Sequence, residues 1–319
     1  MRKEALLSSQ IEGTQSSLSD LLLQEIAETP GLPLEDVQET TNYIAALNHG
    51  LSRLRGGFPL SLRLVREIHA ILLNQGRGSD KTPGEFRTSQ NWIGGSRPGN
   101  ALYVPLPPER VMECMGELEK FLHEDHPEIP GLVKAALMHL QFETIHPFLD
   151  GNGRLGRLLV TFLLCANGSL REPLLYLRLY LKTHRDTYYD LLMKVRRDGD
   201  WETWVEFFLT GVRDTSDQAV QTAREILALF ERDHKRVQEL GASSTSALLV
   251  FRHAQRQPLF TVSHTARHTG LGFPAVSRAV ERMEALGILR ETTGKQRGRI
   301  YAYSDYLKIL SEGTEPLPR

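Results

Sequence analysis

Hydrophobic residues recur at helical spacing along most of the chain, which predicts a mainly α-helical protein. The pattern is clearest on either side of residues 146–154. Residues 131–145 before this stretch and 155–163 after it both place apolar side chains at i, i+3 and i+4, which is typical of buried helix faces. We therefore expect a short loop between two packed helices, the second of which ends at Asn167-Gly168.

Further helices are expected on both sides of this pair. The N-terminal stretch 1–28 is predicted to form two helices with a break near residues 12–14, and residues 30–33 form a linker. The other predicted helices are 35–55, 61–75, 108–125, 174–182, 184–197, 200–212 and 215–240. Residues 76–108 have no helical period and are rich in Gly, Pro, Ser and Asn. A loop of this length in a compact domain is usually functional.

A different pattern occupies residues 243–304. The predicted elements are helix 244–254, a short apolar run at 259–262, helix 263–269, a helix opened by Pro274, and strands at 288–291 and 299–303. Pro274 stands at the first position of its helix, where proline is preferred. The two strands flank a tip at 292–298 that is rich in glycine and basic residues.

The length of 319 residues allows about two domains. We divide the chain into an N-terminal helical region, a central core, a connector helix, a C-terminal domain and a tail. The expected boundaries are 1–58, 59–214, 215–242, 243–306 and 307–319.

Composition is ordinary for a globular protein, with 40% hydrophobic and 24% charged residues. The net charge of −1 gives the chain no general bias toward polyanions, but residues 243–304 carry nine Lys/Arg against three Asp/Glu, a net +6. Cys114 and Cys165 lie in apolar helical patterns, which predicts buried thiols of a reducing compartment rather than a disulfide or metal site. No signal peptide or span of ~20 apolar residues occurs. We expect a cytoplasmic protein with no membrane partner.

The loop between the two central helices has the chemistry of a phosphate site. Gly151-Asn152-Gly153 leaves backbone N–H groups uncrowded at a helix N-terminus, where anions bind. Asp150 is a hard oxygen ligand, and one carboxylate together with phosphates is the usual way to hold Mg²⁺. His146 titrates near neutral pH and can accept a proton from an attacking hydroxyl.

Two arginines complete this set. Arg154 and Arg157 are three residues apart, so they share one helix face and can grip phosphate oxygens. Each feature alone has a commoner explanation: a capping histidine, a glycine turn, or a solvated pair of arginines. Their coincidence within twelve residues indicates phosphoryl or nucleotidyl transfer.

Residues 146–157, HPFLDGNGRLGR, closely resemble the signature of the Fic family, His-x-Phe-x-Asp/Glu-Gly-Asn-Gly-Arg-x-x-Arg, with every specified position matched. The resemblance implies an all-helical Fic core that transfers AMP from ATP to a hydroxyl side chain of a protein. It implies His146 as the base, Asp150 as the Mg²⁺ ligand, Gly151, Asn152 and Gly153 as the anion hole, and Arg154 and Arg157 on the phosphates.

Residues 8–13, SSQIEG, resemble the inhibitory motif of Fic proteins, Ser/Thr-x-x-x-Glu-Gly/Asn, which ends here at Gly13. Ser8 and Glu12 are one helical turn apart and share a face. The resemblance implies that Glu12 pairs with Arg157 and denies this arginine to the γ-phosphate of ATP. The residues alone leave open that Glu12 is an exposed glutamate at a helix end.

The loop at 76–108 resembles the Fic flap, a small hairpin over the active site that aligns the target segment by strand pairing. The flap residues on this reading are Asn91, Trp92, Ile93, Gly94 and Tyr103. A purely structural hairpin with Trp92 as its packing residue is the alternative. Fic proteins often carry tyrosines near the adenine pocket, and the resemblance implies this place for Tyr188 and Tyr189. Aromatic residues at helical spacing are more often part of a core.

The succession of three helices and a hairpin in 243–304 resembles a winged helix-turn-helix domain. Outward Ser277, Arg278 and Arg282, with the basic tip at 292–298, suit duplex DNA. A unit that docks protein partners or the Fic core is equally consistent. The expected fold class is therefore mainly α, with a Fic-type helical core, a small β-hairpin flap and a C-terminal winged helix-turn-helix domain.

The leading hypothesis is a protein adenylyltransferase that uses ATP and Mg²⁺, modifies a Ser, Thr or Tyr hydroxyl of a target protein, and is inhibited by Glu12. One alternative is a Fic relative that transfers another group or removes AMP, with Glu12 helping to activate water. Another is a DNA-binding regulator whose Fic core senses a nucleotide. A homodimer is left open.

Overall fold

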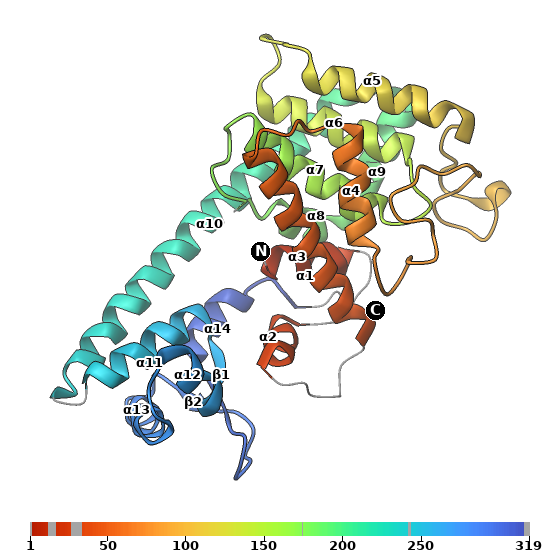
Figure 1. The fold of residues 1–319 in the computed structure, drawn as a ribbon. Helices are drawn as coiled ribbons and strands as arrows, with labels where there is room; N and C mark the ends of the chain where they lie inside the picture. The colour runs from red at the N-terminus through yellow and green to blue at the C-terminus, as the bar shows by residue number, and fades with distance from the viewer. Residues whose placement is uncertain (1, 12–16, 27–33, 174, 242–243, 316–319) are drawn as a thin grey trace. The chain divides into compact units, whose positions relative to one another are not determined.

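The computed structural model describes residues 2–11, 17–26, 34–173, 175–241 and 244–315. The chain forms two compact units (Figure 1). The first contains residues 1–15, 33–217 and 316–319, and the second contains 16–32 and 218–315. Among the described residues, no helix has both the length and the apolar character that crossing a membrane requires.

The first unit is helical, as its sequence pattern predicts. Its helices are α1 (Arg2–Ile11), α3 (Leu34–Arg55), α4 (Leu62–Leu72), α5 (Val111–His123), α6 (Gly131–Ile145), α7 (Asn152–Ala166), α8 (Leu177–Thr183), α9 (Arg185–Asp198) and the first part of α10 (Trp201–Gln238). Two short 3₁₀ turns, η1 (Pro98–Asn100) and η2 (Pro108–Arg110), lie in the region predicted to be a loop. The predicted helices of this unit up to α9 are confirmed, with small shifts at their ends.

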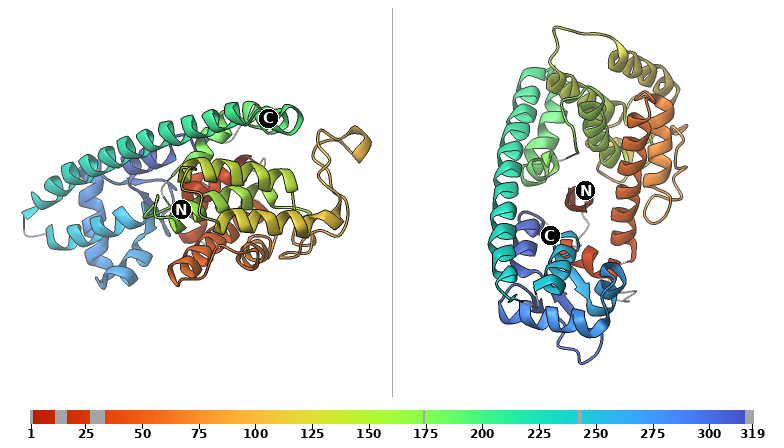
Figure 2. Two further views of the ribbon diagram at one scale, coloured as in Figure 1. Left: turned by 90° about the horizontal axis from the view of Figure 1, so that it is seen from above. Right: turned by 60° about the vertical axis from the view of Figure 1, so that its left-hand side comes forward.

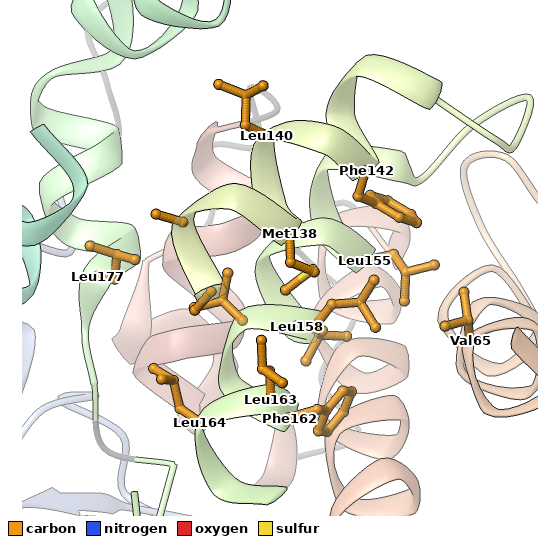
Figure 3. Close-up of a cluster of buried hydrophobic side chains, with 14 of the residues drawn as sticks. Val65, Met138, Leu140, Phe142, Leu155, Leu158, Phe162, Leu163, Leu164 and Leu177 are labelled. Carbon is orange, nitrogen blue, oxygen red and sulfur yellow. The ribbon is translucent and has the colours of Figure 1, made fainter. Parts of the chain in front are cut away.

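Helix α7 lies at the centre of the first core and contacts α3, α4 and α6. Its apolar stripe is buried, and Leu155, Leu158 and Phe162 are fully covered. Figure 3 shows these side chains gathered with Met138 of α6 and Val65 of α4. Because α7 is surrounded by packed neighbours, its first turn and the loop before it are held in one place.

Local signals determine where these helices begin and end. Ser61 caps α4 by accepting a hydrogen bond from the Leu64 N–H through its hydroxyl. Pro130 precedes α6, which begins at the next residue. Gly199 ends α9 in the left-handed conformation with φ 70°, which glycine adopts without a steric penalty.

The prediction of two helices at 200–212 and 215–240 is wrong, because α10 continues unbroken from Trp201 to Gln238 (Figure 2). Gly211 would favour a break, but a Cβ at this position would lie 2.6 Å from the Tyr180 ring. The missing side chain therefore makes room for an aromatic neighbour within a continuous helix. The Thr215 hydroxyl donates to the Gly211 carbonyl and stays within the helix.

The second unit combines helices with a small antiparallel sheet. Its further elements are α2 (Leu18–Ile26), α11 (Ser244–Arg256), β1 (Leu259–Thr261), α12 (Val262–Thr269), α13 (Phe273–Ala285), β2 (Arg290–Glu291), β3 (Ile300–Ala302) and α14 (Ser304–Ser311). The strand order is β1-β3-β2, with Leu259 opposite Ala302. Helix α2 packs on β1 and α14, although it lies near the N-terminus. Neither this packing nor α14 was evident from the sequence pattern.

Cys114 and Cys165 are free thiols. The prediction that both are buried is wrong, because each is only half-buried at the edge of the first core. Both still lie on helices whose apolar faces pack inward, so the helical pattern was correct and only the depth was overestimated.

The close approach of α3 and α7 leads to a prediction about stability. A Cβ at Gly50 of α3 would lie 2.3 Å from the Phe162 ring of α7, whereas a Cβ at Gly116 inside α5 would meet nothing within 4 Å. We expect Gly50→Ala to lower the free energy of unfolding by ~1–3 kcal/mol through overpacking. Gly116→Ala should raise it by ~0.5–1 kcal/mol, because alanine is the better helix former. Urea unfolding followed by far-UV circular dichroism measures both, and a neutral Gly50→Ala would contradict the packing described.

Candidate active site

Two residues in the left-handed conformation shape the loop between α6 and α7. His146 ends α6 with φ 50° and ψ 60°, and Gly151 begins α7 with φ 77°. Between them Phe148 is fully buried, and its backbone N–H and carbonyl both bond to the Asn152 side chain at 2.9 and 2.8 Å. The Asn152 side chain therefore closes the loop, and only its backbone N–H is available to an anion at the α7 N-terminus.

A histidine that the sequence analysis missed supports this loop from α4. The ring of His69 stacks on Phe148 with 3.7 Å between centroids and 11° between planes. The Gly84 N–H donates to His69 Nδ1 at 2.8 Å, so the ring proton lies on Nε2, which donates to the Asp150 carbonyl at 3.0 Å. Burial lowers the pKa of His69 to about 4, so the ring is neutral at physiological pH. The sequence indicated only that His69 lies next to Ile68 in an amphipathic helix, which does not predict its contact with the loop.

Asp150 lies at the mouth of the loop, with its side chain 29% exposed. Its Oδ1 accepts a hydrogen bond from the Gly151 N–H at 2.6 Å and lies 3.6 Å from Arg154 Nη2. Among the described residues, no group of three His, Cys, Asp or Glu side chains is arranged to hold a metal ion. A single, partly exposed carboxylate suits Mg²⁺ that takes its other ligands from phosphates and water, so the residues present fit this ion.

The candidate base has a carboxylate beside it. Glu143, one turn earlier on α6, places Oε2 at 3.9 Å from His146 Nδ1, and its side chain is only 7% exposed. A Cβ at Gly156 would lie 2.5 Å from Glu143 Oε1, so the missing side chain at this position makes room for the carboxylate. A buried negative charge at this distance stabilises an imidazolium formed when the histidine takes up a proton.

Arg154 is held inside the protein by acidic side chains. Its side chain is 3% exposed, and Nη1 lies 3.2 Å from Glu39 Oε2 of α3, which is equally buried. Together with Asp150, Glu39 fixes the direction of the guanidinium at the first turn of α7. Glu39 was missed by the sequence analysis, because nothing in a single sequence links it to a residue more than a hundred positions away.

Arg157 is bound by helix α1. It is 3% exposed, its Nε donates to the Ser8 hydroxyl at 3.2 Å, and its Nη2 donates to the Ser8 carbonyl at 3.1 Å. The structure thus brings the first residue of the predicted inhibitory motif to the second arginine of the loop motif. Glu12 and Gly13 lie outside the described residues.

Two further cations attach α1 to α8. Arg178 forms a buried ion pair with Glu4 and also donates to the Arg157 carbonyl at 2.9 Å. Lys182 donates to the Gln10 side chain at 2.7 Å. Burial lowers the pKa of Arg178 to about 9, which still leaves the guanidinium charged at neutral pH. Helix α1 therefore faces a row of three cations.

The predicted flap differs in detail from a hairpin. Ile93 and Tyr103 form one isolated antiparallel bridge, in which the Ile93 N–H donates to the Tyr103 carbonyl at 2.8 Å. The Asn91 amide attaches this segment to the loop by donating to the Phe148 carbonyl at 2.9 Å. Trp92 is 39% exposed, so it is not fully buried, and both interpretations of this residue stay predictions.

The two tyrosines lie in different environments. Tyr188 is fully buried, bonds to His139 Nε2 at 2.9 Å and packs near Trp204. Tyr189 is half-buried beside it, with ring centroids 5.0 Å apart. Burial lowers the pKa of His139 to about 4, so this polar pair is neutral inside the aromatic cluster. The structure gives Tyr188 a packing role.

Comparison with known protein families supports the motif. Residues 59–164 match the Fic/DOC family, and residues 1–52 match the Fic/DOC family N-terminal region. Proteins named "Protein adenylyltransferase Fic" from Aedes aegypti and Drosophila yakuba are 31% and 29% identical over 221 and 210 residues. The matches cover 68% and 65% of this chain but 41% and 39% of those proteins. The chain thus spans about two fifths of the length of these relatives.

Solved structures show the same fold. A Fic family protein from Desulfovibrio desulfuricans G20 superposes with a TM-score of 0.58 at 21% identity, over 94% of this chain and 86% of that one. Fic-1 from C. elegans, residues 134–508, has a TM-score of 0.55 at 24% identity, over 68% of this chain and 61% of that one. The loop motif therefore lies inside the range that matches the Fic/DOC family, residues 59–164, and the match to the N-terminal region of that family covers residues 1–52.

Proposed function

We propose that this chain transfers AMP from ATP to a hydroxyl side chain of a target protein. The observation that carries the proposal is the loop between α6 and α7, which brings His146, Asp150 and Arg154 to the first turn of a buried helix. The relatives named as adenylyltransferases support the same chemistry. This arrangement offers a base, a cation ligand and an anion site within one rigid element.

In the proposed reaction the target hydroxyl gives its proton to His146, and its oxygen attacks the α-phosphorus of ATP. The new P–O bond forms as the bond to the β-phosphate oxygen breaks, and pyrophosphate leaves. The Glu143 carboxylate stabilises the imidazolium, and the N-terminal N–H groups of α7 stabilise negative charge on the phosphates. When bound at Asp150, Mg²⁺ supplies further charge neutralisation to the triphosphate.

The proposed target segment lies along the flap. Beside the bridge between Ile93 and Tyr103, Leu102 is 73% exposed and Val104 is 43% exposed. An extended peptide can add to such an edge by backbone hydrogen bonds, with its side chains on exposed apolar residues. The proposed partner is therefore an extended segment that carries Ser, Thr or Tyr.

Helix α1 is the proposed inhibitor. Its support is the pair of hydrogen bonds from Arg157 to Ser8, which occupy the arginine proposed to hold the γ-phosphate. Glu12, one turn after Ser8, is the proposed carboxylate partner of this arginine. With Arg157 held by α1, ATP binds without the alignment that in-line attack requires. Removal of AMP from a modified target, with Glu12 activating water, is the alternative use of the same residues.

DNA binding by the second unit is a second candidate function. The order α11, β1, α12, α13, β2, β3 with the sheet β1-β3-β2 supports the proposed resemblance to a winged helix-turn-helix domain. Arg278 and Arg282 are exposed on α13, and the tip at 294–298 is exposed between β2 and β3. These basic groups suit phosphates of duplex DNA.

We expect His146→Ala to lower AMP transfer by ~10²–10⁴-fold, because a general base contributes this much. ATP binding should persist, since the anion site and the arginines remain. Transfer of labelled AMP from ATP to the protein itself or to lysate proteins measures the rate, in a Glu12→Gly background that removes the proposed inhibition. His123→Ala, an exposed histidine at the end of α5, is the matched control. An unchanged rate in His146→Ala would rule out this base.

We expect Glu12→Gly to raise AMP transfer by roughly 5–150-fold, the range of a coupling worth about 1–3 kcal/mol. Removing the carboxylate frees Arg157 for the γ-phosphate. The control is Glu12→Gly combined with Arg157→Ala, in which the gain should be lost. Equal labelling by wild type and Glu12→Gly would contradict inhibition, and slower loss of AMP from a labelled target would place Glu12 in the reverse reaction.

We expect the whole chain to bind duplex DNA with a steep salt dependence. Each Lys or Arg that contacts a phosphate adds about −0.9 to the slope of log K against log salt, so Arg278→Ala with Arg282→Ala should reduce the slope by about 2. Mobility shifts at several salt concentrations measure this, and Arg224→Ala, exposed on α10, is the control for a lost charge. No retention at low salt would favour a protein-docking unit instead.

A further inference from the structure

Arg87 is a buried arginine whose positive charge is stabilised by backbone carbonyl groups. Its side chain is 2% exposed, yet within the described residues the guanidinium forms no ion pair. It donates instead to four backbone carbonyls. These belong to Ile145 and His146 at the end of α6, at 3.4 and 2.9 Å, and to Ser89 and Leu106 on the two sides of the flap, at 3.3 and 2.5 Å. A buried cation with this many oriented partners holds them in a fixed geometry.

The end of α6 would otherwise carry unsatisfied carbonyl groups, because helices leave their last four without partners. Here side chains satisfy each one in turn. Arg196 donates to the Glu143 carbonyl at 2.8 Å, and the Tyr103 hydroxyl donates to the Thr144 carbonyl at 2.8 Å. Arg87 takes the next two positions, which include the carbonyl of the candidate base. Its positive charge also lies at the negative end of the helix.

The backbone of His146 requires such support. Among the described residues other than glycine, only Thr82 and His146 have a positive φ. This conformation persists only where the surroundings enforce it. Arg87 Nε donates to the His146 carbonyl and the Arg87 backbone N–H donates to the Pro147 carbonyl, both at 2.9 Å, so Arg87 holds the two peptide groups on either side of Pro147. These two hydrogen bonds fix the direction in which the chain leaves α6.

We propose that Arg87 is a positioning residue for the reaction, whose guanidinium and backbone N–H set the left-handed backbone of His146 and thereby aim its imidazole at the target hydroxyl. The inference rests on the proposed function, in which His146 is the base. Lysine cannot replace Arg87. The planar guanidinium spreads its N–H donors over carbonyls on three separate segments, and a single ammonium group cannot reach all of them.

A role limited to holding the flap makes a different prediction. Arg87 also binds Ser89 and Leu106, so its loss could disturb only the target segment. In that case the KM for the target would rise and kcat would stay the same, because uniform binding is lost. Misaligning the base instead lowers kcat and leaves both KM values nearly unchanged.

The kinetic test compares Arg87→Lys with its parent in the Glu12→Gly background, with labelled ATP and a modifiable target. We expect kcat to fall by about 10²-fold, as a small misplacement of a catalytic group can produce. Both KM values should stay within about threefold. Arg66→Lys is the matched control, because Arg66 also donates to a backbone carbonyl, that of Gly84 at 2.7 Å, and its described hydrogen bonds go to residues 84 and 85 rather than to α6.

A chemical rescue separates positioning from general damage. Added guanidinium should partly restore kcat in Arg87→Ala by occupying the vacated site, and should leave His146→Ala inactive. Full kcat in Arg87→Lys, or a change confined to the KM for the target, would overturn the inference. Arg87→Gln serves as the second variant if thermal unfolding shows that Arg87→Lys is not folded, with the same criteria.

A spectroscopic test does not depend on AMP transfer. The ¹³Cα and ¹⁵N shifts of His146, assigned through His146→Asn, report its backbone conformation in the protein without nucleotide. We expect them to move in Arg87→Lys, while those of Leu158 in the core do not. Unchanged His146 shifts in folded Arg87→Lys would overturn the inference. If wild type and Glu12→Gly transfer no AMP, the proposed function fails, and these shifts still decide whether Arg87 positions His146.

Discussion

The site depends on how the C-terminal end of α6 and the N-terminal end of α7 meet at the loop between them. The carbonyl end of α6 is satisfied by protein side chains, namely Arg87, Tyr103 and Arg196. Gly151 precedes the N-terminus of α7 and donates its N–H to the Asp150 side chain, while the Asn152 side chain bonds back to Phe148. Protein cations therefore compensate the negative helix end, and the positive end remains for an external anion. In the proposed function, this asymmetry lets a loop between two buried helices bind phosphate without a large basic surface.

The sequence predicts the local part of this arrangement well. The helices around the loop, the loop itself and its charged residues follow from apolar spacing and from the chemistry of a few adjacent positions. The partners that hold those residues could not be predicted, because Glu39, His69 and Arg87 are distant in sequence and unremarkable by type. Periodicity identifies the face of a helix that is buried, but does not identify the polar residue of another helix that lies against it.

The same limit explains the errors in the remaining helices. A glycine in the middle of α10 favours a break when the sequence is considered alone, but the Tyr180 ring packs against Gly211 and the helix continues. Likewise, α2 follows α1 closely in sequence but belongs to the second compact unit, on β1 and α14. In both cases packing between residues distant in sequence determined the structure, and such packing cannot be predicted from local sequence patterns.

The way α1 is held bears on how the inhibition proposed for this helix would be relieved. Ala5 and Ile11 are fully buried in the first core, and Glu4 pairs with buried Arg178. Withdrawing the whole helix would expose apolar surface worth on the order of 2–3 kcal/mol for Ile11 alone and would leave a buried charge unpaired at a cost of about 3–5 kcal/mol. Moving only the end that follows Ser8 would keep the Glu4–Arg178 pair, but it would still expose Ile11 and would leave both hydrogen bonds from Arg157 to Ser8 in place. If α1 inhibits as proposed, the route with the smallest cost is therefore a turn of the Arg157 side chain away from Ser8, which breaks two hydrogen bonds and leaves the helix docked.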